Sequence, residues 1–142
     1  MKADDRLLLG IDRRKSAEVL EAAYADREGV TARFNMNVLA RINDELGGHF
    51  DLSTFEHQAI YAGEHGRVEM HLRSRRGQVV AIDALQMSVA FQSGETVHTE
   101  NSYKYSDQEI EQLAAQAGCR IEEHWQDLRG QFSTVLFAPH SP

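Results

Sequence analysis

The chain has 142 residues, a formal net charge of -7 and 42% hydrophobic residues. This length allows a domain with a real hydrophobic core, and the acidic balance argues against general binding to nucleic acid or to a membrane surface. No apolar run approaches the roughly 18 residues of a membrane span, and no apolar region of a signal peptide follows the polar N-terminus. The single cysteine, Cys119, cannot form an internal disulfide, so we expect a buried, inert thiol and a cytoplasmic location.

The segment from Leu7 to Asp12 predicts a strand near the N-terminus. Its apolar residues are continuous, which is typical of a strand buried on both faces in a parallel sheet. A parallel strand needs neighbours, and the following residues do not supply them. We therefore expect an exposed edge that invites pairing with another chain, giving a dimer or a poorly soluble species.

Two helices are expected next. Ser16 is a residue type that caps helix N-termini, so a first helix is expected after it. Thr31 is expected to cap a longer helix that ends at Gly47 and Gly48. Three asparagines in this second helix indicate either side-chain hydrogen bonding or simple exposure, and both readings stay open. The expected apolar stripes are Val19, Leu20, Ala23 and Tyr24, then Phe34, Val38, Ile42 and Leu46; the asparagines are Asn35, Asn37 and Asn43.

The middle of the chain predicts antiparallel β-structure, because apolar residues alternate there. Val68, Met70 and Leu72 are expected to share one face of a strand. Turns are expected at residues 75–77 and 93–94, and they separate this strand from later ones.

The extended segment after these turns carries Glu100 and Ser102. Side chains alternate between the two faces of a strand, so Glu100 and Ser102 are expected on one face with Thr96 and His98. A strand rises about 3.4 Å per residue, which places Glu100 and Ser102 about 7 Å apart along that face. A neutral imidazole has one N–H donor and one ring-nitrogen acceptor. A carboxylate accepts from the first and a hydroxyl donates to the second, so the pair suits an imidazole. The alternative is an exposed strand with cross-strand hydrogen bonds.

The last third is expected to contain a helix and two strands. Ser106 and Glu109 form the pattern of a capping box, and Gly118 is expected to stop the helix that follows. The two strands are expected at residues 120–127 and 132–138.

Spacing gives no support to three other kinds of site. The seven histidines show no metal-binding pattern, so no metal is expected. A triad of Ser102, His98 and Glu100 lacks the G-x-S-x-G turn and an oxyanion hole. Gly63 to Gly66 is only G-x-x-G between two strands, a turn in place of a nucleotide loop. We therefore name no catalytic residue and no cofactor-binding residue.

Five segments, in their order and spacing, carry a resemblance to one enzyme family. They are residues 7–12 (LLLGID), 23–24 (AY), 29–37 (GVTARFNMN), 69–72 (EMHL) and 98–105 (HTENSYKY). Across about residues 7–136 the chain resembles the histidine-specific Nα-methyltransferases of ergothioneine biosynthesis. These are Rossmann-like enzymes whose cofactor is S-adenosylmethionine (SAM).

The resemblance implies roles for five positions. Glu100 and Ser102 would hold the imidazole of the substrate histidine, with Met70 packed beside the ring. Tyr24 would help to bind the substrate carboxylate, and Thr31 would lie near the same pocket. The implied reaction is repeated methyl transfer from SAM to the α-amino group of L-histidine. Related indole-alkaloid methyltransferases act on a different amino acid, and the Glu/Ser pair favours histidine here.

The resemblance also implies an incomplete enzyme, because family members carry a preceding region with the SAM glycine loop. We expect a mixed α/β chain that is the C-terminal half of a Rossmann-like methyltransferase sheet. Residues 1–15 would be a buried strand of that sheet, residues 16–105 an inserted α+β substrate-binding lobe, and residues 106–142 the final helix and two strands. Such a chain would be inactive alone. The alternatives are one subunit of a split methyltransferase, completed by a SAM-binding half, and a non-enzymatic amino-acid-binding or interaction module. Neither nucleic acid nor a membrane is an expected partner.

Overall fold

The computed structural model describes residues 1–25 and 28–140. The chain forms two compact units. The first unit contains Met1–Ser16, Glu64–Arg67 and the residues from Tyr103 onward, and the second contains Ala17–Gly63 and Val68–Ser102. Helices and antiparallel sheets occur together, which confirms the expected mixed α/β class. None of the described helices is both long enough and apolar enough to cross a lipid bilayer.

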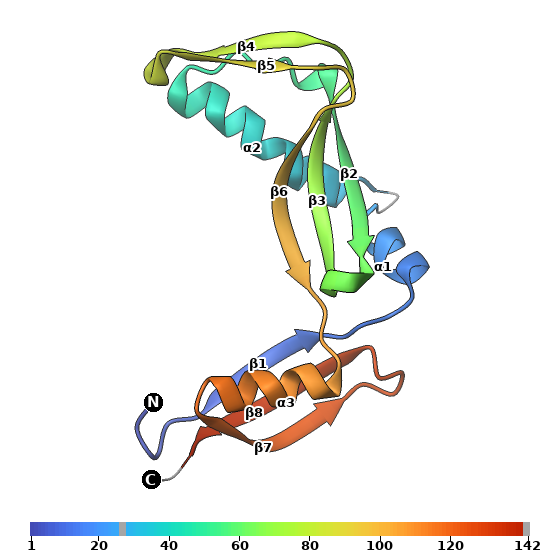
Figure 1. The fold of residues 1–142 in the computed structure, drawn as a ribbon, viewed down its shortest axis with the longest axis vertical. Helices are drawn as coiled ribbons and strands as arrows, with labels where there is room; N and C mark the ends of the chain where they lie inside the picture. The colour runs from blue at the N-terminus through green and yellow to red at the C-terminus, as the bar shows by residue number, and fades with distance from the viewer. Residues whose placement is uncertain (26–27, 141–142) are drawn as a thin grey trace. The chain divides into compact units, whose positions relative to one another are not determined.

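The first unit is a three-stranded antiparallel sheet with the strand order β1-β8-β7. The helix α3 lies across one face of this sheet (Figure 1). Their shared core contains Ile11, Ile110, Ala114, Cys119, Val135 and Phe137, so the expectation of a buried thiol is confirmed. The elements are β1 (Leu7–Asp12), α3 (Asp107–Gln116), β7 (Cys119–Gln126) and β8 (Phe132–Pro139).

The structure shows how β1 is paired within this chain. The strand pairs antiparallel with β8, from Leu7 opposite Phe137 to Asp12 opposite Phe132, and it forms the edge of the sheet. Leu8 is 61% exposed, and Ile11 is the buried residue of the strand. Within the described residues β1 therefore has an antiparallel partner on one side and an exposed edge on the other, and its burial in a larger sheet stays a prediction. A continuous apolar run does not specify which neighbour covers it, and here α3 covers one face.

The second unit combines two helices with two antiparallel sheets, ordered β2-β3-β6 and β4-β5. In the first of these sheets successive strands run in opposite directions (Figure 1). Its elements are α1 (Ala17–Tyr24), α2 (Val30–Leu46), β2 (Phe55–Ala62), β3 (Arg67–Ser74), β4 (Gln78–Ile82), β5 (Met87–Phe91) and β6 (Thr96–Tyr103). Short 3-10 turns occupy Leu52–Thr54, Gly63–His65 and Asp83–Leu85.

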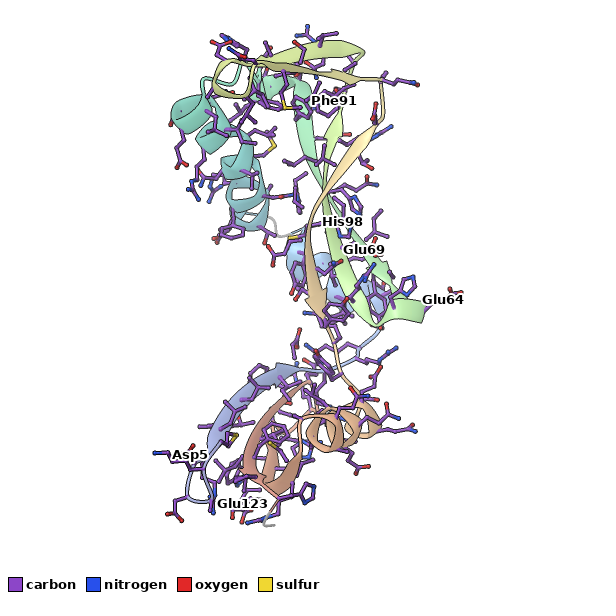
Figure 2. All side chains as sticks on the ribbon, turned by 60° about the vertical axis from the view of Figure 1, so that its left-hand side comes forward. Asp5, Glu64, Glu69, Phe91, His98 and Glu123 are labelled. Atoms are coloured by element: carbon purple, nitrogen blue, oxygen red, sulfur yellow. The ribbon has the colours of Figure 1, made fainter. Side chains whose placement is uncertain are left out.

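The alternation predicted for β3 is confirmed, since Val68, Met70 and Leu72 are all buried. Further along the strand, Leu72 belongs to a core between α2 and the β4–β5 hairpin. Phe91, at the end of β5, contributes its side chain to this core (Figure 2). The buried members of this core are Leu39, Phe50, Phe55, Leu72, Val80, Ile82 and Phe91.

The helix α2 begins two residues earlier than expected. Gly29, in the left-handed conformation at φ 65°, is its N-cap, so Thr31 lies inside the helix and is not the cap. Its C-terminal end agrees with the prediction, because Gly47 adopts φ 61° just after the last residue. Phe34 is 68% exposed, and the buried positions are Asn35 and Leu39. The buried face of α2 is therefore centred on Asn35 and Leu39, and the expected apolar stripe that begins at Phe34 lies to one side of it.

The asparagines of α2 divide between the two readings that the sequence left open. Asn35 is buried and bonds to two acceptors, and Asn43 bonds to both the N–H and the carbonyl of Phe50. Asn37 is exposed. Side-chain hydrogen bonding therefore explains two of the three weak helix formers.

The capping box of α3 is present as predicted. Ser106 Oγ accepts from the N–H of Glu109 at 3.3 Å, and Glu109 Oε2 accepts from the N–H of Ser106 at 2.8 Å. The same carboxylate accepts hydrogen bonds from the Arg14 guanidinium. The Arg14 bond, with those from Ser106, lowers the pKa of Glu109 from its ordinary 4.5 to about 2.

We predict that Glu109→Gln reduces stability at neutral pH and that its effect fades in acid. The folded-state pKa lies below the unfolded one, so this stabilisation is present above pH 4.5 and is lost as pH falls toward about 2. Glutamine keeps the capping-box geometry but not the charge. Chemical denaturation along a pH series measures the difference between wild type and variant. Glu111→Gln, at an exposed position of the same helix, is the control. A difference that stays constant from neutral to acid pH would contradict the assignment.

Candidate functional site

The structure places all five expected substrate-binding residues in the second unit. Tyr24 is the last residue of α1, and Thr31 is the second residue of α2. Met70 belongs to β3, and Glu100 and Ser102 belong to β6. Four separate elements therefore contribute these residues to one compact unit, and of the five only Glu100 lines the groove described below.

Tyr24 and Ser102 are in direct contact. The hydroxyl of Tyr24 lies 2.6 Å from Ser102 Oγ, and either oxygen can be the donor. Both side chains are half-buried. This bond joins the C-terminal end of α1 to β6, and it holds two hydroxyl groups side by side.

Met70 is linked to β6 through its backbone. Its side chain is 2% exposed, and its carbonyl accepts a hydrogen bond from Thr99 Oγ1 at 2.9 Å. Thr99 immediately precedes Glu100, so this bond holds the strand at the position from which the Glu100 side chain projects.

Glu100 lines a groove of about 330 Å³ between α2 and β6. The exposed side chains of Phe34 and Val38 supply apolar surface along it. In the described part of the chain, the Glu100 carboxylate has no hydrogen-bond or ion-pair partner. An unpaired carboxylate beside apolar surface suits a ring that carries an N–H donor. The groove is lined by Phe34, Asn35, Asn37, Val38, Arg41, Ile42, Glu45, Leu46, Thr99 and Glu100.

A second carboxylate at the groove, Glu45, is already engaged. Arg41 Nε donates to it at 2.8 Å, one turn apart on α2. This hydrogen bond lowers the pKa of Glu45, so the group is ionised and paired at neutral pH. Glu100 is therefore the groove carboxylate that is available to a ligand.

His98 and Ser102 have different neighbours, although period two predicted a shared face. The ring of His98 stacks on that of His71, with centroids 4.6 Å apart and planes at 23°. Its Nε2 lies 2.8 Å from Asn101 Oδ1 and 3.2 Å from the Glu100 carbonyl. These contacts give no support to a triad of Ser102, His98 and Glu100.

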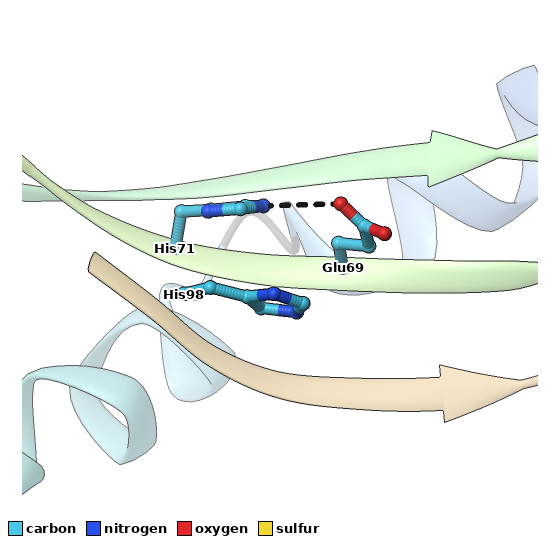
Figure 3. Close-up of side chains that lie close together, drawn as sticks. All are labelled: Glu69, His71 and His98. Carbon is cyan, nitrogen blue, oxygen red and sulfur yellow. Dashed lines mark hydrogen bonds and ion pairs between the residues drawn. The ribbon is translucent and has the colours of Figure 1, made fainter. Parts of the chain in front are cut away.

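The fold brings together a potential metal-ligand set that sequence spacing missed. Glu69, His71 and His98 each offer a ligand atom within 4.8 Å of the others, and both Glu69 and His98 come from the β2-β3-β6 sheet (Figures 2 and 3). His98 comes from a strand distant in sequence, so no local motif could reveal the set.

The geometry of this cluster does not fit a bound metal. The two rings lie nearly parallel, so their in-plane lone pairs run side by side and do not converge on one point (Figure 3). His71 Nε2 lies 3.4 Å from Glu69 Oε2. Among the described residues, His71 Nδ1 is buried without a partner. A metal on Nε2 would put a proton on that buried Nδ1, whereas a metal-bound histidine normally donates its second N–H to an acceptor. We therefore assign His71 as a donor to Glu69.

The described residues also do not fit the nucleotide part of SAM. The G-x-x-G sequence forms a 3-10 turn between β2 and β3 and does not lead into a helix. Gly66, at φ 60°, is approached by the guanidinium of Arg14, which occupies the space that a phosphate or adenosyl group would need.

Comparison with known proteins shows the family to which the chain belongs. A family model described as "Histidine-specific methyltransferase, SAM-dependent" matches residues 1–139. A histidine N-alpha-methyltransferase of Mycolicibacterium smegmatis is 43% identical over 136 residues, covering 96% of this chain and 42% of that protein. Ergothioneine biosynthesis protein 1 of Schizosaccharomyces pombe is 27% identical over 139 residues, covering 97% and 18%. An L-tryptophan methyltransferase of Psilocybe serbica is 30% identical over 132 residues, covering 92% and 37%. The chain thus spans less than half the length of these relatives.

We predict that Tyr24→Phe lowers the free energy of unfolding by about 0.5–1.5 kcal/mol, the usual net value of one intramolecular hydrogen bond. The variant removes the hydroxyl that contacts Ser102 and leaves the ring in place. Urea denaturation measures the change. Tyr61→Phe is the matched control, because among the described residues the Tyr61 hydroxyl has no partner. Equal stability of Tyr24→Phe and wild type would show that this contact contributes nothing.

Proposed function

Because the chain belongs to the histidine-specific, SAM-dependent methyltransferase family, we propose that it is the substrate-recognition part of an enzyme that methylates the α-amino group of L-histidine. The observation that carries this proposal is the unpaired Glu100 carboxylate in its groove, two residues from the Ser102–Tyr24 pair. These groups match the donor and acceptor pattern of histidine.

Each proposed role follows from the chemistry of the group. Glu100 accepts the imidazole N–H, and Ser102 donates its hydroxyl proton to the other ring nitrogen. Met70 packs beside the ring. On binding, Tyr24 exchanges its hydrogen bond with Ser102 for one to the substrate carboxylate, so each hydroxyl donates its one proton to the substrate. Thr31 lies near the same pocket. The chain's contribution is to bind and orient the two ends of the substrate, which reduces the entropic cost of reaction.

We further propose that the domain boundaries follow the methyltransferase plan. Residues 1–15 and 106–142 would belong to the sheet that the family builds around SAM, and residues 16–105 would be the inserted substrate lobe. Two observations support this. The chain spans 42% of the relative from M. smegmatis, and the turn at Gly66 does not fit a nucleotide. The chain alone would then be inactive, and a SAM-binding half would complete the enzyme.

We predict that Glu100→Gln weakens the binding of L-histidine at least tenfold. Hydrogen bonds to a charged group contribute about 1.5–3 kcal/mol, and each 1.4 kcal/mol is about tenfold in affinity. Isothermal titration of the full chain with L-histidine, followed by S-adenosylhomocysteine, measures the affinity for each compound. We expect histidine to bind and the cofactor product not to bind.

The controls for this titration separate the competing readings. Glu18→Gln, at an exposed position of α1, should leave the histidine affinity unchanged. L-tryptophan should bind more weakly than L-histidine, because indole offers no acceptor to Ser102. Unchanged affinity in Glu100→Gln would overturn the imidazole assignment. Tight binding of S-adenosylhomocysteine would show that the chain carries its own cofactor site. Histidine binding without methylation, even after a SAM-binding half is added, would favour the non-enzymatic module.

We also propose β1 as the surface where a second polypeptide pairs with this chain, either a SAM-binding half or a second copy. Leu8 is exposed on the edge strand, and apolar side chains of β1 and α3 border a second pocket of about 260 Å³ with Cys119 and Phe137. An apolar edge strand with unpaired backbone groups is a template for strand addition.

We predict that the wild-type chain self-associates and that Leu8→Lys suppresses this, because a charge on an edge strand opposes pairing. Sedimentation velocity over a concentration series measures the change. Val79→Lys, at an exposed apolar position on β4, is the control and should still associate. A wild-type chain that stays monomeric at high concentration would exclude the second copy as partner.

A further inference from the structure

The helix α1 depends on tertiary contacts for its position. It has eight residues, and helices this short are not stable alone in water. Leu20 is its one buried residue, at 1% exposure. Hydrogen bonds connect it to β2. The N–H of Tyr61 donates to Glu21 Oε1 at 3.2 Å, and His57 Nε2 lies 3.1 Å from the Tyr24 carbonyl.

The orientation of a buried amide fixes the direction of the second bond. Asn35 is 3% exposed, and its Nδ2 lies 3.1 Å from the His71 carbonyl. A carbonyl can only accept, so the atom that faces it must be the amide NH₂ group. The same Nδ2 lies 3.0 Å from His57 Nδ1. His57 Nδ1 must therefore act as an acceptor.

This constraint defines the proton on His57. With Nδ1 accepting from Asn35, the ring is neutral and carries its proton on Nε2. Nε2 then donates to the carbonyl of Tyr24. That carbonyl lies in the last turn of α1, where backbone carbonyls have no partner within the helix. His57 thus acts as a side-chain cap for the end of α1.

We propose that His57, oriented by Asn35, is a positioning residue that holds the Tyr24 hydroxyl against Ser102 for substrate binding. The inference rests on the proposed function, because Tyr24 and Ser102 contact substrate only in that reading. The connection runs from the His71 carbonyl through Asn35 and His57 to the Tyr24 backbone, and from the Tyr24 side chain to Ser102. A misplacement of about 1 Å at such a group can cost on the order of 10²-fold in rate, so the anchor is functionally significant.

Two conservative variants separate the two bonds of His57. In His57→Asn the amide oxygen can replace Nδ1 and accept from Asn35, but no donor reaches the Tyr24 carbonyl. In His57→Gln the amide NH₂ can replace Nε2 and donate to that carbonyl. We expect His57→Asn to weaken L-histidine binding about tenfold and His57→Gln to bind nearly as wild type, with titration of the full chain as the measurement. His65→Asn, at an exposed position, is the control.

A spectroscopic readout tests the same bonds without substrate. Nitrogen-15 spectra of the full chain should show His57 as the neutral Nε2–H tautomer at neutral pH. The ring signals of Tyr24 should shift in His57→Asn and return toward wild type in His57→Gln. A His57 ring protonated on Nδ1, or Tyr24 signals that do not move in His57→Asn, would overturn the proposal even if a variant folds poorly.

The outcomes also separate this inference from the proposed function. If Glu100→Gln loses histidine binding while His57→Asn keeps it, the positioning role is wrong and histidine recognition stands. If Glu100→Gln and His57→Asn both bind histidine as wild type does, both proposals fail. If only His57→Asn loses binding and His57→Gln restores it, positioning of Tyr24 stands and the role of Glu100 is wrong.

Discussion

Burial of one face of β3 is the constraint on which the second unit depends. Val68, Met70 and Leu72 are almost fully enclosed, and β3 lies between β2 and β6. Burying this face also affects the polar backbone beside it, because an unpaired buried carbonyl is costly. Two successive carbonyls of β3 are bonded by side chains, Met70 by Thr99 and His71 by Asn35. These two bonds connect the central strand to β6 and to α2.

The candidate site is a consequence of these bonds. Thr99 holds β6 next to the point where Glu100 enters the groove, and Asn35 orients His57, which in turn holds the end of α1 at Tyr24. The substrate-binding groups that we propose therefore project from backbone that is hydrogen-bonded back to the core. A site of this kind is held in position before a ligand arrives, which lowers the entropic cost of binding.

The first unit follows a different principle. Its helix α3 is defined locally by the capping box, and the Glu109 carboxylate of that box also pairs with Arg14, which follows β1 in the chain. One ionised group thus fixes both the start of the helix and the residue that leads out of the strand. The helix α3 and the strand β8 cover β1 only in part. The exposed apolar edge of β1 is the surface at which we propose that a partner pairs.

The sequence determined the features that depend on near neighbours. The capping box at Ser106, the helix stop at Gly47 and the alternation through Met70 are all encoded within a few residues, because local hydrogen bonds and side-chain periodicity depend on adjacent positions. The residues proposed to bind substrate also came from sequence, through the resemblance of short segments. Tertiary structure alone decided the antiparallel partner of β1 and the exposure of Phe34. It also decided the stacking of His98 on His71 and the bond from Asn35 to His57. Each of these depends on a residue from a distant segment, and a polar side chain in a buried helix face has no defined role until the fold supplies the acceptor that faces it.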